Sequence, residues 1–296
     1  MLLFHHMSQV IIVFLLLSII GGTNAPLVKN GLKDFAPSTL VFLRFALASL
    51  ILLPFVLKEK IIFKGNFKLL LLGGFAMAAN VILYAVGLQY TSVAVSQLIF
   101  VPKALVVSLL AYIFLKETIS KNKKLGLLFT MAGMSILVYG SYQTQDVLSF
   151  GKPIGNLLIM VGFLFSCSFY VISRKISKDY SPLTITFFSF VVATIMSSPF
   201  ALFEYSSANH ISGQITTLSI LNLMALAVFS SIIVYYLSQY LIKHASTYIA
   251  ALTLYMNFLI AGVAGIIFFS EKITLSLIIA ACLIIFGVYI ATKDEK

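Results

Sequence analysis

The sequence predicts an all-α membrane protein of ten transmembrane helices, arranged as two five-helix halves of opposite orientation. Three observations lead there: an extreme composition, ten long apolar runs, and similarity between the two halves of the chain. Of the 296 residues, 60% are hydrophobic and 10% are charged, and the mean hydropathy is +1.06. A soluble domain carries roughly 25% charged residues, so this chain belongs in a lipid bilayer.

The apolar runs are the length of membrane-crossing helices. A helix needs ~20 apolar residues to cross the ~30 Å hydrocarbon core. Transmembrane strands would instead alternate in segments of ~10 residues, and these runs are continuously apolar. Cutting the chain at charges, prolines and polar clusters predicts helices at 7–28, 37–57, 67–88, 93–114, 122–141, 154–174, 182–203, 217–241, 246–269 and 273–292.

The basic residues are distributed unevenly between the gaps. Of the 20 Lys and Arg residues, 14 lie in gaps on the side of the N-terminus or in the C-terminal tail, four lie in gaps on the other side, and two lie within runs. Cytoplasmic loops carry the excess of positive charge, so both termini should be cytoplasmic and the location the cytoplasmic (inner) membrane. The net charge of +11 forms no continuous stripe, which argues against nucleic acid as a partner. The first run has no cleavage motif, and we expect it to remain as a span.

The two halves of the chain resemble each other. A shift of 145 residues aligns KDFAP (33–37) with KDYSP (178–182) and Glu59 with Glu204. A shift of 154 aligns Glu117 with Glu271. Duplication predicts one repeat over 1–143 and a second over 144–296, each with five spans. An odd number of spans inverts the second copy relative to the first.

Several short motifs resemble the EamA-type members of the drug/metabolite transporter superfamily. They are GGTNAPLVK (21–29), FLRF (42–45), FLKETIS (114–120), SRK (173–175) and FFSEKIT (268–274). The resemblance covers nearly the whole chain. It implies a ten-helix fold with a central substrate cavity lined by spans one, three, four, six, eight and nine, and transport of small metabolites by alternating access.

Two basic residues lie within predicted spans, where charge is expensive and often marks a functional site. Lys103 lies about ten residues into span four, at ~15 Å of depth, and Asn257 is its counterpart at the 154-residue shift. An ammonium group facing a polar cavity predicts an anionic or zwitterionic substrate, although Lys103 could instead stabilise helix packing. For Arg44 we expect a structural role on a peripheral helix.

Neutral polar residues on the spans expected to face the cavity complete the predicted substrate site. They could equally form hydrogen bonds between helices. The candidates beside Lys103 and Asn257 are Asn24, Asn80, Tyr84, Tyr170, Tyr236 and Gln239.

Two further patterns predict structural roles. Gly126, Gly133 and Gly140 recur at seven-residue spacing, as expected where another helix approaches closely. Glu117 and Glu271 precede spans five and ten, where a carboxylate can cap the free N–H groups at a helix start.

The function predicted is a secondary transporter for a small metabolite, such as an amino acid. The sequence has no paired intramembrane carboxylates, no His cluster and no phosphate-binding loop, so we expect no enzyme activity, no catalytic residues, no metal site and no cofactor. A channel, a lipid-translocating protein or a membrane-assembly protein remains the alternative. The substrate, the direction of transport, the coupling ion and the choice between monomer and homodimer stay open.

Overall fold

The computed structural model describes residues 2–59, 66–115, 119–206, 215–244 and 247–292, apart from the side chains of 2–10, 111, 115, 247–252 and 292. This part of the chain is helical and contains no strand. The helices are α1 (Leu2–Gly22), α2 (Asn24–Gly31), α3 (Pro37–Lys58), α4 (Phe67–Leu88), α5 (Val93–Phe100), α6 (Lys103–Leu115), α7 (Lys121–Thr144), α8 (Pro153–Ile176), α9 (Pro182–Ser206), α10 (Thr217–Ala225), the π-helical stretch η1 (Leu226–Ile233), α11 (Val234–His244), α12 (Thr247–Phe269) and α13 (Leu275–Thr292).

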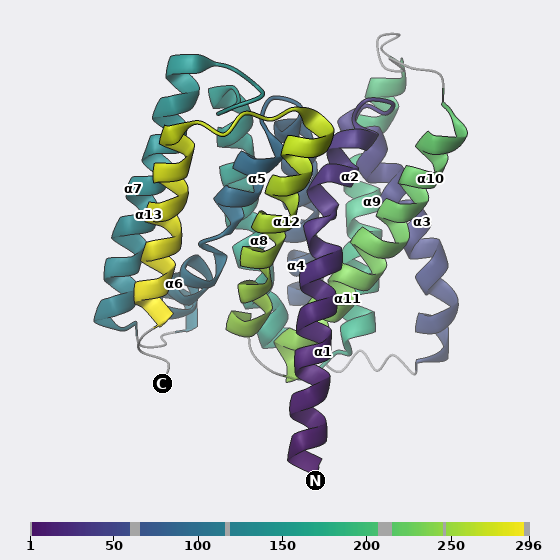
Figure 1. Ribbon diagram of the computed structural model, residues 1–296. Coiled ribbons are helices and arrows are strands. Elements are labelled where there is room, and N and C mark those ends of the chain that lie inside the picture. The colour runs from purple at the N-terminus through teal and green to yellow at the C-terminus, as the bar shows by residue number, and fades with distance from the viewer. Residues whose placement is uncertain (1, 60–65, 116–118, 207–214, 245–246, 293–296) are drawn as a thin grey trace.

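The expected membrane helices are present in the described residues. Eight helical segments are long and apolar enough to cross a bilayer, and two shorter apolar helices cover Thr253–Phe269 and Leu275–Ala291. The start of α1 and the end of α13 lie on the same side of the bundle (Figure 1). Large apolar side chains cover much of the outer surface, as a lipid-facing surface requires.

Three of the expected spans are interrupted. The first is divided at Thr23 into α1 and α2, and the fourth at Val101 and Pro102 into α5 and α6. Pro102 has no N–H group to donate to the carbonyl four residues earlier, which explains why the helical hydrogen bonding is interrupted after Phe100. The eighth span runs through α10, η1 and α11, so its middle is wound more widely than an α-helix.

Helices from the two halves of the chain pack as pairs. The main pairs are α3 with α9, α4 with α8, and α7 with α13. Figure 1 shows α7 and α13 side by side at one edge of the bundle. Further contacts join α1 with α12 and α5 with α12, so helices of both halves meet in the centre.

Two glutamates cap helices of the opposite half. Glu59, which follows α3, accepts a hydrogen bond from the Thr184 hydroxyl at the start of α9 (3.1 Å). Glu204, near the end of α9, accepts bonds from the Ser38 and Thr39 amides at the start of α3 (3.0 and 2.8 Å). Free amides at a helix start favour a negative charge. The two contacts therefore fasten α3 and α9 to each other at both ends.

The predicted glycine stripe is a packing surface, which confirms its expected role. A Cβ added at Gly126 would meet the carbonyl oxygen of Gly287 on α13, and one at Gly133 would lie 2.8 Å from the Ala280 oxygen. Further along, Gly140 packs against the Phe150 ring. The absence of side chains thus lets α7 and α13 approach backbone to backbone.

A small substitution at this contact should destabilise the protein. In Gly287→Ala, the added methyl would lie 2.6 Å from the Gly126 oxygen, and relieving such overpacking costs about 1–3 kcal/mol. We expect a lower melting temperature of the detergent-purified protein. Gly262→Ala is the matched control, because nothing lies within 4 Å of its added Cβ. Equal melting temperatures for the two variants would contradict close packing of α7 on α13.

Candidate functional site

A cavity of about 120 Å³ lies in the centre of the bundle. Its walls come from α1 to α6 in the first half and from α8, η1, α11 and α12 in the second. An apolar cavity of about 150 Å³ holds benzene, so this space suits a solute of about that size or slightly smaller. In this conformation the cavity is too small for a drug-sized ligand, which needs roughly 300 Å³ or more.

Six of the eight predicted site residues line this cavity. They come from segments far apart in the sequence, which the fold brings together. The six are Asn24, Asn80, Tyr84, Lys103, Tyr170 and Asn257.

The other two predicted residues lie elsewhere. Tyr236 is 38% exposed on the bundle surface, and its neighbour Tyr235 lines the cavity instead. Consecutive helical residues point about 100° apart, so only one of the two tyrosines can face inward. Gln239 is buried, but its amide donates to the Ser173 hydroxyl on α8 at 3.1 Å. It links two helices away from the cavity.

The expectation of a peripheral Arg44 is wrong. Its side chain is 6% exposed and lines the cavity. The guanidinium donates from Nε to the Ser231 hydroxyl (2.6 Å) and from Nη2 to the Ser230 carbonyl (2.7 Å) and the Asn24 side-chain oxygen (3.1 Å). These partners are all neutral. An arginine within an apolar run indicates an internal site, whereas the resemblance of the FLRF motif favours a peripheral helix. The structure agrees with the first of these two signals.

Lys103 is the first residue of α6 and is 4% exposed. Its ammonium nitrogen lies 3.7 Å from the centroid of the Tyr170 ring and 5.6 Å from that of Phe100. Within the described chain no oxygen forms a hydrogen bond or ion pair with this group. A cation over an aromatic face is stabilised modestly, so the ammonium remains available to an anionic ligand.

Polar residues that the sequence analysis overlooked also line the cavity. Gln97 donates to the Tyr84 hydroxyl at 2.9 Å, and the Tyr170 hydroxyl lies 2.8 Å from the Ser238 hydroxyl. Gln97 and Ser238 are polar residues in apolar runs, but the sequence does not show which side of each helix faces the cavity. The polar lining residues outside the eight predicted ones are Arg44, Gln97, Ser166, Ser230, Tyr235, Ser238 and Thr253.

Two asparagines that line the cavity have unsatisfied polar atoms. The side-chain oxygens of Asn80 and Asn257 are buried and accept no hydrogen bond from the described residues. A buried polar atom without a partner is costly and often indicates a missing ligand or water. Gly21 makes room for Asn257, because an added Cβ would lie 2.8 Å from its amide nitrogen.

The connection between α4 and α5 is held at one end of the cavity by two opposite charges. The Lys29 ammonium donates to the Leu88 and Thr91 carbonyls (2.7 and 2.6 Å) near the end of α4. Glu271 accepts hydrogen bonds from the Val93 and Ala94 amides at the start of α5. Each charge complements the adjacent helix end. The predicted capping role of Glu271 is thus correct in kind but wrong in its target, which is α5 and not span ten.

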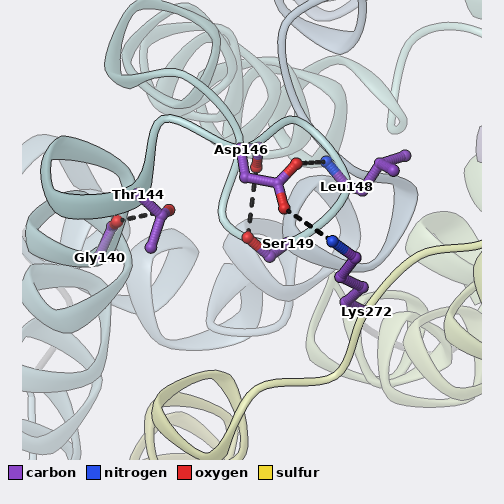
Figure 2. A network of polar contacts seen from close by, with 6 residues as sticks. All are labelled: Gly140, Thr144, Asp146, Leu148, Ser149 and Lys272. Carbon is purple, nitrogen blue, oxygen red and sulfur yellow. Dashed lines mark hydrogen bonds and ion pairs between the residues drawn. The ribbon is translucent and has the colours of Figure 1, made fainter.

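Neighbouring loops reinforce this end of the bundle. Asp146 accepts a hydrogen bond from the Leu148 amide at 3.0 Å and lies 3.6 Å from the Lys272 ammonium (Figure 2). The Lys272 amide also donates to the Leu148 carbonyl at 2.8 Å. The ion pair is exposed and contributes little by itself, but the set joins the loop after α7 to the loop after α12. Glu117 lies outside the described residues.

The carboxyl group of Glu271 should make stability depend on pH. Burial raises its pKa above the ordinary 4.5, while the Val93 and Ala94 amides and Lys29 oppose that shift. The folded state therefore binds this proton more tightly than the unfolded state, and stability falls as pH rises from 4.5 through the raised pKa.

Thermal melting across this pH window tests the effect. Wild type should gain melting temperature, relative to Glu271→Gln, as the pH is lowered toward 4.5. Ile273→Val, at an exposed neighbouring position, is the control and should follow wild type. Parallel profiles for wild type and Glu271→Gln would show that this carboxyl does not titrate with a raised pKa.

The described residues contain no group of three or more His, Cys, Asp or Glu side chains placed to hold a metal ion. The site instead offers two cations, amide groups and aromatic rings. Such groups can bind a polar solute.

Comparison with known proteins identifies similar chains. Residues 8–139 and 153–293 match the model of the EamA-like transporter family. An uncharacterized transporter of Archaeoglobus fulgidus is 27% identical over 90% of this chain and 92% of its own length. The uncharacterized transporter YyaM of Bacillus subtilis is 29% identical over 63% of each chain. A solved crystal structure with 16% identity, covering 96% of this chain and 97% of its own, has the same fold with a TM-score of 0.66.

Proposed function

Because this chain belongs to the EamA-like transporter family, we propose that it is a secondary transporter for a small anionic or zwitterionic metabolite. It would work by alternating access in the cytoplasmic (inner) membrane. It is a multi-pass membrane protein, and its relatives carry the name transporter.

Lys103 is the observation that carries this proposal. A charged side chain in the middle of a bilayer costs ~2.5–3.5 kcal/mol on insertion scales, and here it has no charged or hydrogen-bonding partner among the described residues. Such a residue persists where it has a function. An ammonium in a cavity between the two halves of a transporter fits the binding of an anionic group.

The reciprocal glutamate caps support an inverted duplication. Glu59 and Glu204 are related by the 145-residue shift, and so are the residues they reach, Thr39 and Thr184. Each cap joins one half to the other, as a two-fold axis in the membrane plane would require. The family model also falls on two stretches of similar length, one in each proposed repeat. An inverted pair supplies two related states, open to either side, from one interface.

The distribution of basic residues supports an outward-facing position for the α4–α5 connection. With both termini cytoplasmic, the Lys29 and Glu271 contacts with the α4–α5 connection lie at the outer end of the cavity. Opening toward the outside would separate these partners, and opening toward the cytoplasm would keep them. The proposed cycle therefore breaks and remakes this pair of contacts.

Substitution of Lys103 tests the site. Lys103→Met keeps the length of the side chain and removes its charge, so transport should be abolished while folded protein stays in the membrane. Metabolite profiling of cells with and without the protein supplies the substrates to test, and flux into liposomes measures them. Tyr236→Phe is the control, because Tyr236 lies on the outside of the bundle, and it should transport like wild type. Undiminished flux in Lys103→Met would remove this residue from the site.

The same liposomes separate a carrier from a channel. A carrier saturates with substrate and shows counter-flow, because one site is exposed alternately to the two sides. Flux that rises without saturation and shows no counter-flow would contradict the proposal.

Cysteine labelling tests the proposed orientation. Lys152 and Lys68 are exposed at opposite ends of the chain's helices, and the basic-residue distribution places Lys152 outside and Lys68 inside. In a variant without Cys167 and Cys282, Lys152→Cys should react with an impermeant maleimide in intact cells, and Lys68→Cys only after lysis. The reverse pattern would overturn the orientation.

A further inference from the structure

We propose that the transported solute is a small organic anion with net negative charge, bound by Lys103 and Arg44 together, and that its transport moves charge across the membrane. This inference rests on the proposed function and narrows it, because it excludes a zwitterion as the preferred substrate. It also assigns Arg44 to the binding site.

The charges around the cavity are all positive. Lys103 and Arg44 both line it, and the described lining includes no acidic residue. A zwitterion needs a partner for its ammonium group as well as for its carboxylate. The cavity supplies two cations for the carboxylate and only neutral groups for the ammonium group. Both cations repel an ammonium group, whereas both attract an anion.

Arg44 retains a free donor for a ligand. Its bonds to Ser231, Ser230 and Asn24 use Nε and Nη2, and Nη1 has no partner among the described residues. A hydrogen bond from a charged nitrogen such as Nη1 to a carboxylate is stronger than one between neutral groups. The neutral partners on one edge hold the group in place and leave its charge uncompensated.

Two helix interruptions lie at the cavity. Asn24 begins α2 and Lys103 begins α6, and both residues line the cavity. The start of a helix carries a partial positive charge. In transporters with discontinuous helices, such half-helix starts face the anionic group of the substrate. Here an unpaired and almost fully buried ammonium occupies one of these starts.

The remaining lining specifies the neutral part of the solute. Asn80 and Asn257 line the cavity, and their amide groups can form hydrogen bonds with a hydroxyl group. The rings of Phe100, Phe169 and Tyr170 offer apolar faces. A cavity of about 150 Å³ holds the six heavy atoms of benzene, so the roughly 120 Å³ here suits a hydroxy-carboxylate of about that size or slightly smaller.

Charge balance gives the transport a preferred direction. Every acidic residue in the sequence lies outside the predicted spans, so no intramembrane carboxylate is available to carry a compensating proton. One cycle then transfers the charge of the solute. An inside-negative potential of 100 mV favours the exit of a monovalent anion by about 50-fold in the concentration ratio.

Lactate and alanine form a matched pair of probes. Both have six heavy atoms, and they differ in that lactate has a hydroxyl where alanine has an ammonium group. We expect lactate to raise the melting temperature of the purified protein at lower concentrations than alanine does, because binding to the folded state stabilises it. Equal stabilisation by the two probes, stronger stabilisation by alanine, or none by either would overturn the proposal.

Variants assign the effect to the two cations. Lys103→Met and Arg44→Gln should each weaken lactate binding about 10- to 100-fold, as loss of a charged hydrogen bond does. Tyr236→Phe is the control, because Tyr236 lies on the outside of the bundle, and it should bind lactate like wild type. If Arg44→Gln does not fold, Arg44→Lys keeps the charge without the planar group and should retain part of the affinity. Unchanged lactate affinity in Lys103→Met would overturn the assignment.

Membrane potential provides a test on the wild-type protein. In liposomes with a potassium gradient and valinomycin, lactate flux should increase when the potential is negative on the side that it leaves. Saturable flux of lactate or alanine that ignores the potential would overturn this inference and leave the proposed carrier intact. Absence of saturable flux for every metabolite that changes in cells would instead contradict the carrier itself.

Discussion

The structure depends on how positive charge is kept inside a bilayer without a negative partner. Arg44 is stabilised by three neutral oxygens, and Lys103 by the faces of two aromatic rings. Like charges repel, and Arg44 and Lys103 line the same cavity, so each cation makes the other more costly. A solute that brings a negative charge would lower that cost. Binding of an anion would thus offset the repulsion between the two cations.

Acidic residues have the complementary distribution. Glu59, Glu204 and Glu271 all lie beyond or near helix ends, where each accepts hydrogen bonds at the start of a helix far away in the sequence. Negative charge therefore fastens the periphery and positive charge remains in the centre. Because the carboxylates join helices of opposite halves, the contacts that hold the bundle together are also those that a rocking motion between halves would disturb.

The sequence predicted the helices better than their faces. Length and hydropathy located the apolar segments, and the shifted alignment found the glutamates that cap reciprocally. The site was predicted in part: polar residues in apolar runs indicated Lys103, Asn80 and Asn257, all of which line the cavity. Motif similarity predicted a peripheral Arg44, whereas the cost of a charge within a bilayer indicates the internal site that Arg44 occupies. The sequence predicts Tyr236 where Tyr235 lines the cavity, because α-helical spacing alone does not fix which side of a span faces inward.

The π-helical stretch η1 lies directly before Tyr235 and Tyr236 and changes which of them faces inward. It also makes the eighth span sensitive to its exact length. Here the Ser231 hydroxyl donates to the Leu226 carbonyl five residues earlier, and the Ser230 carbonyl receives Arg44. A π-helical stretch contains an extra residue compared with an α-helix. Loss of one residue would turn α11 by about 100° and bring Tyr236 to the place of Tyr235. Insertions and deletions in this span should therefore be tolerated far less well than substitutions. Each would exchange all the α11 side chains that line the cavity for their neighbours.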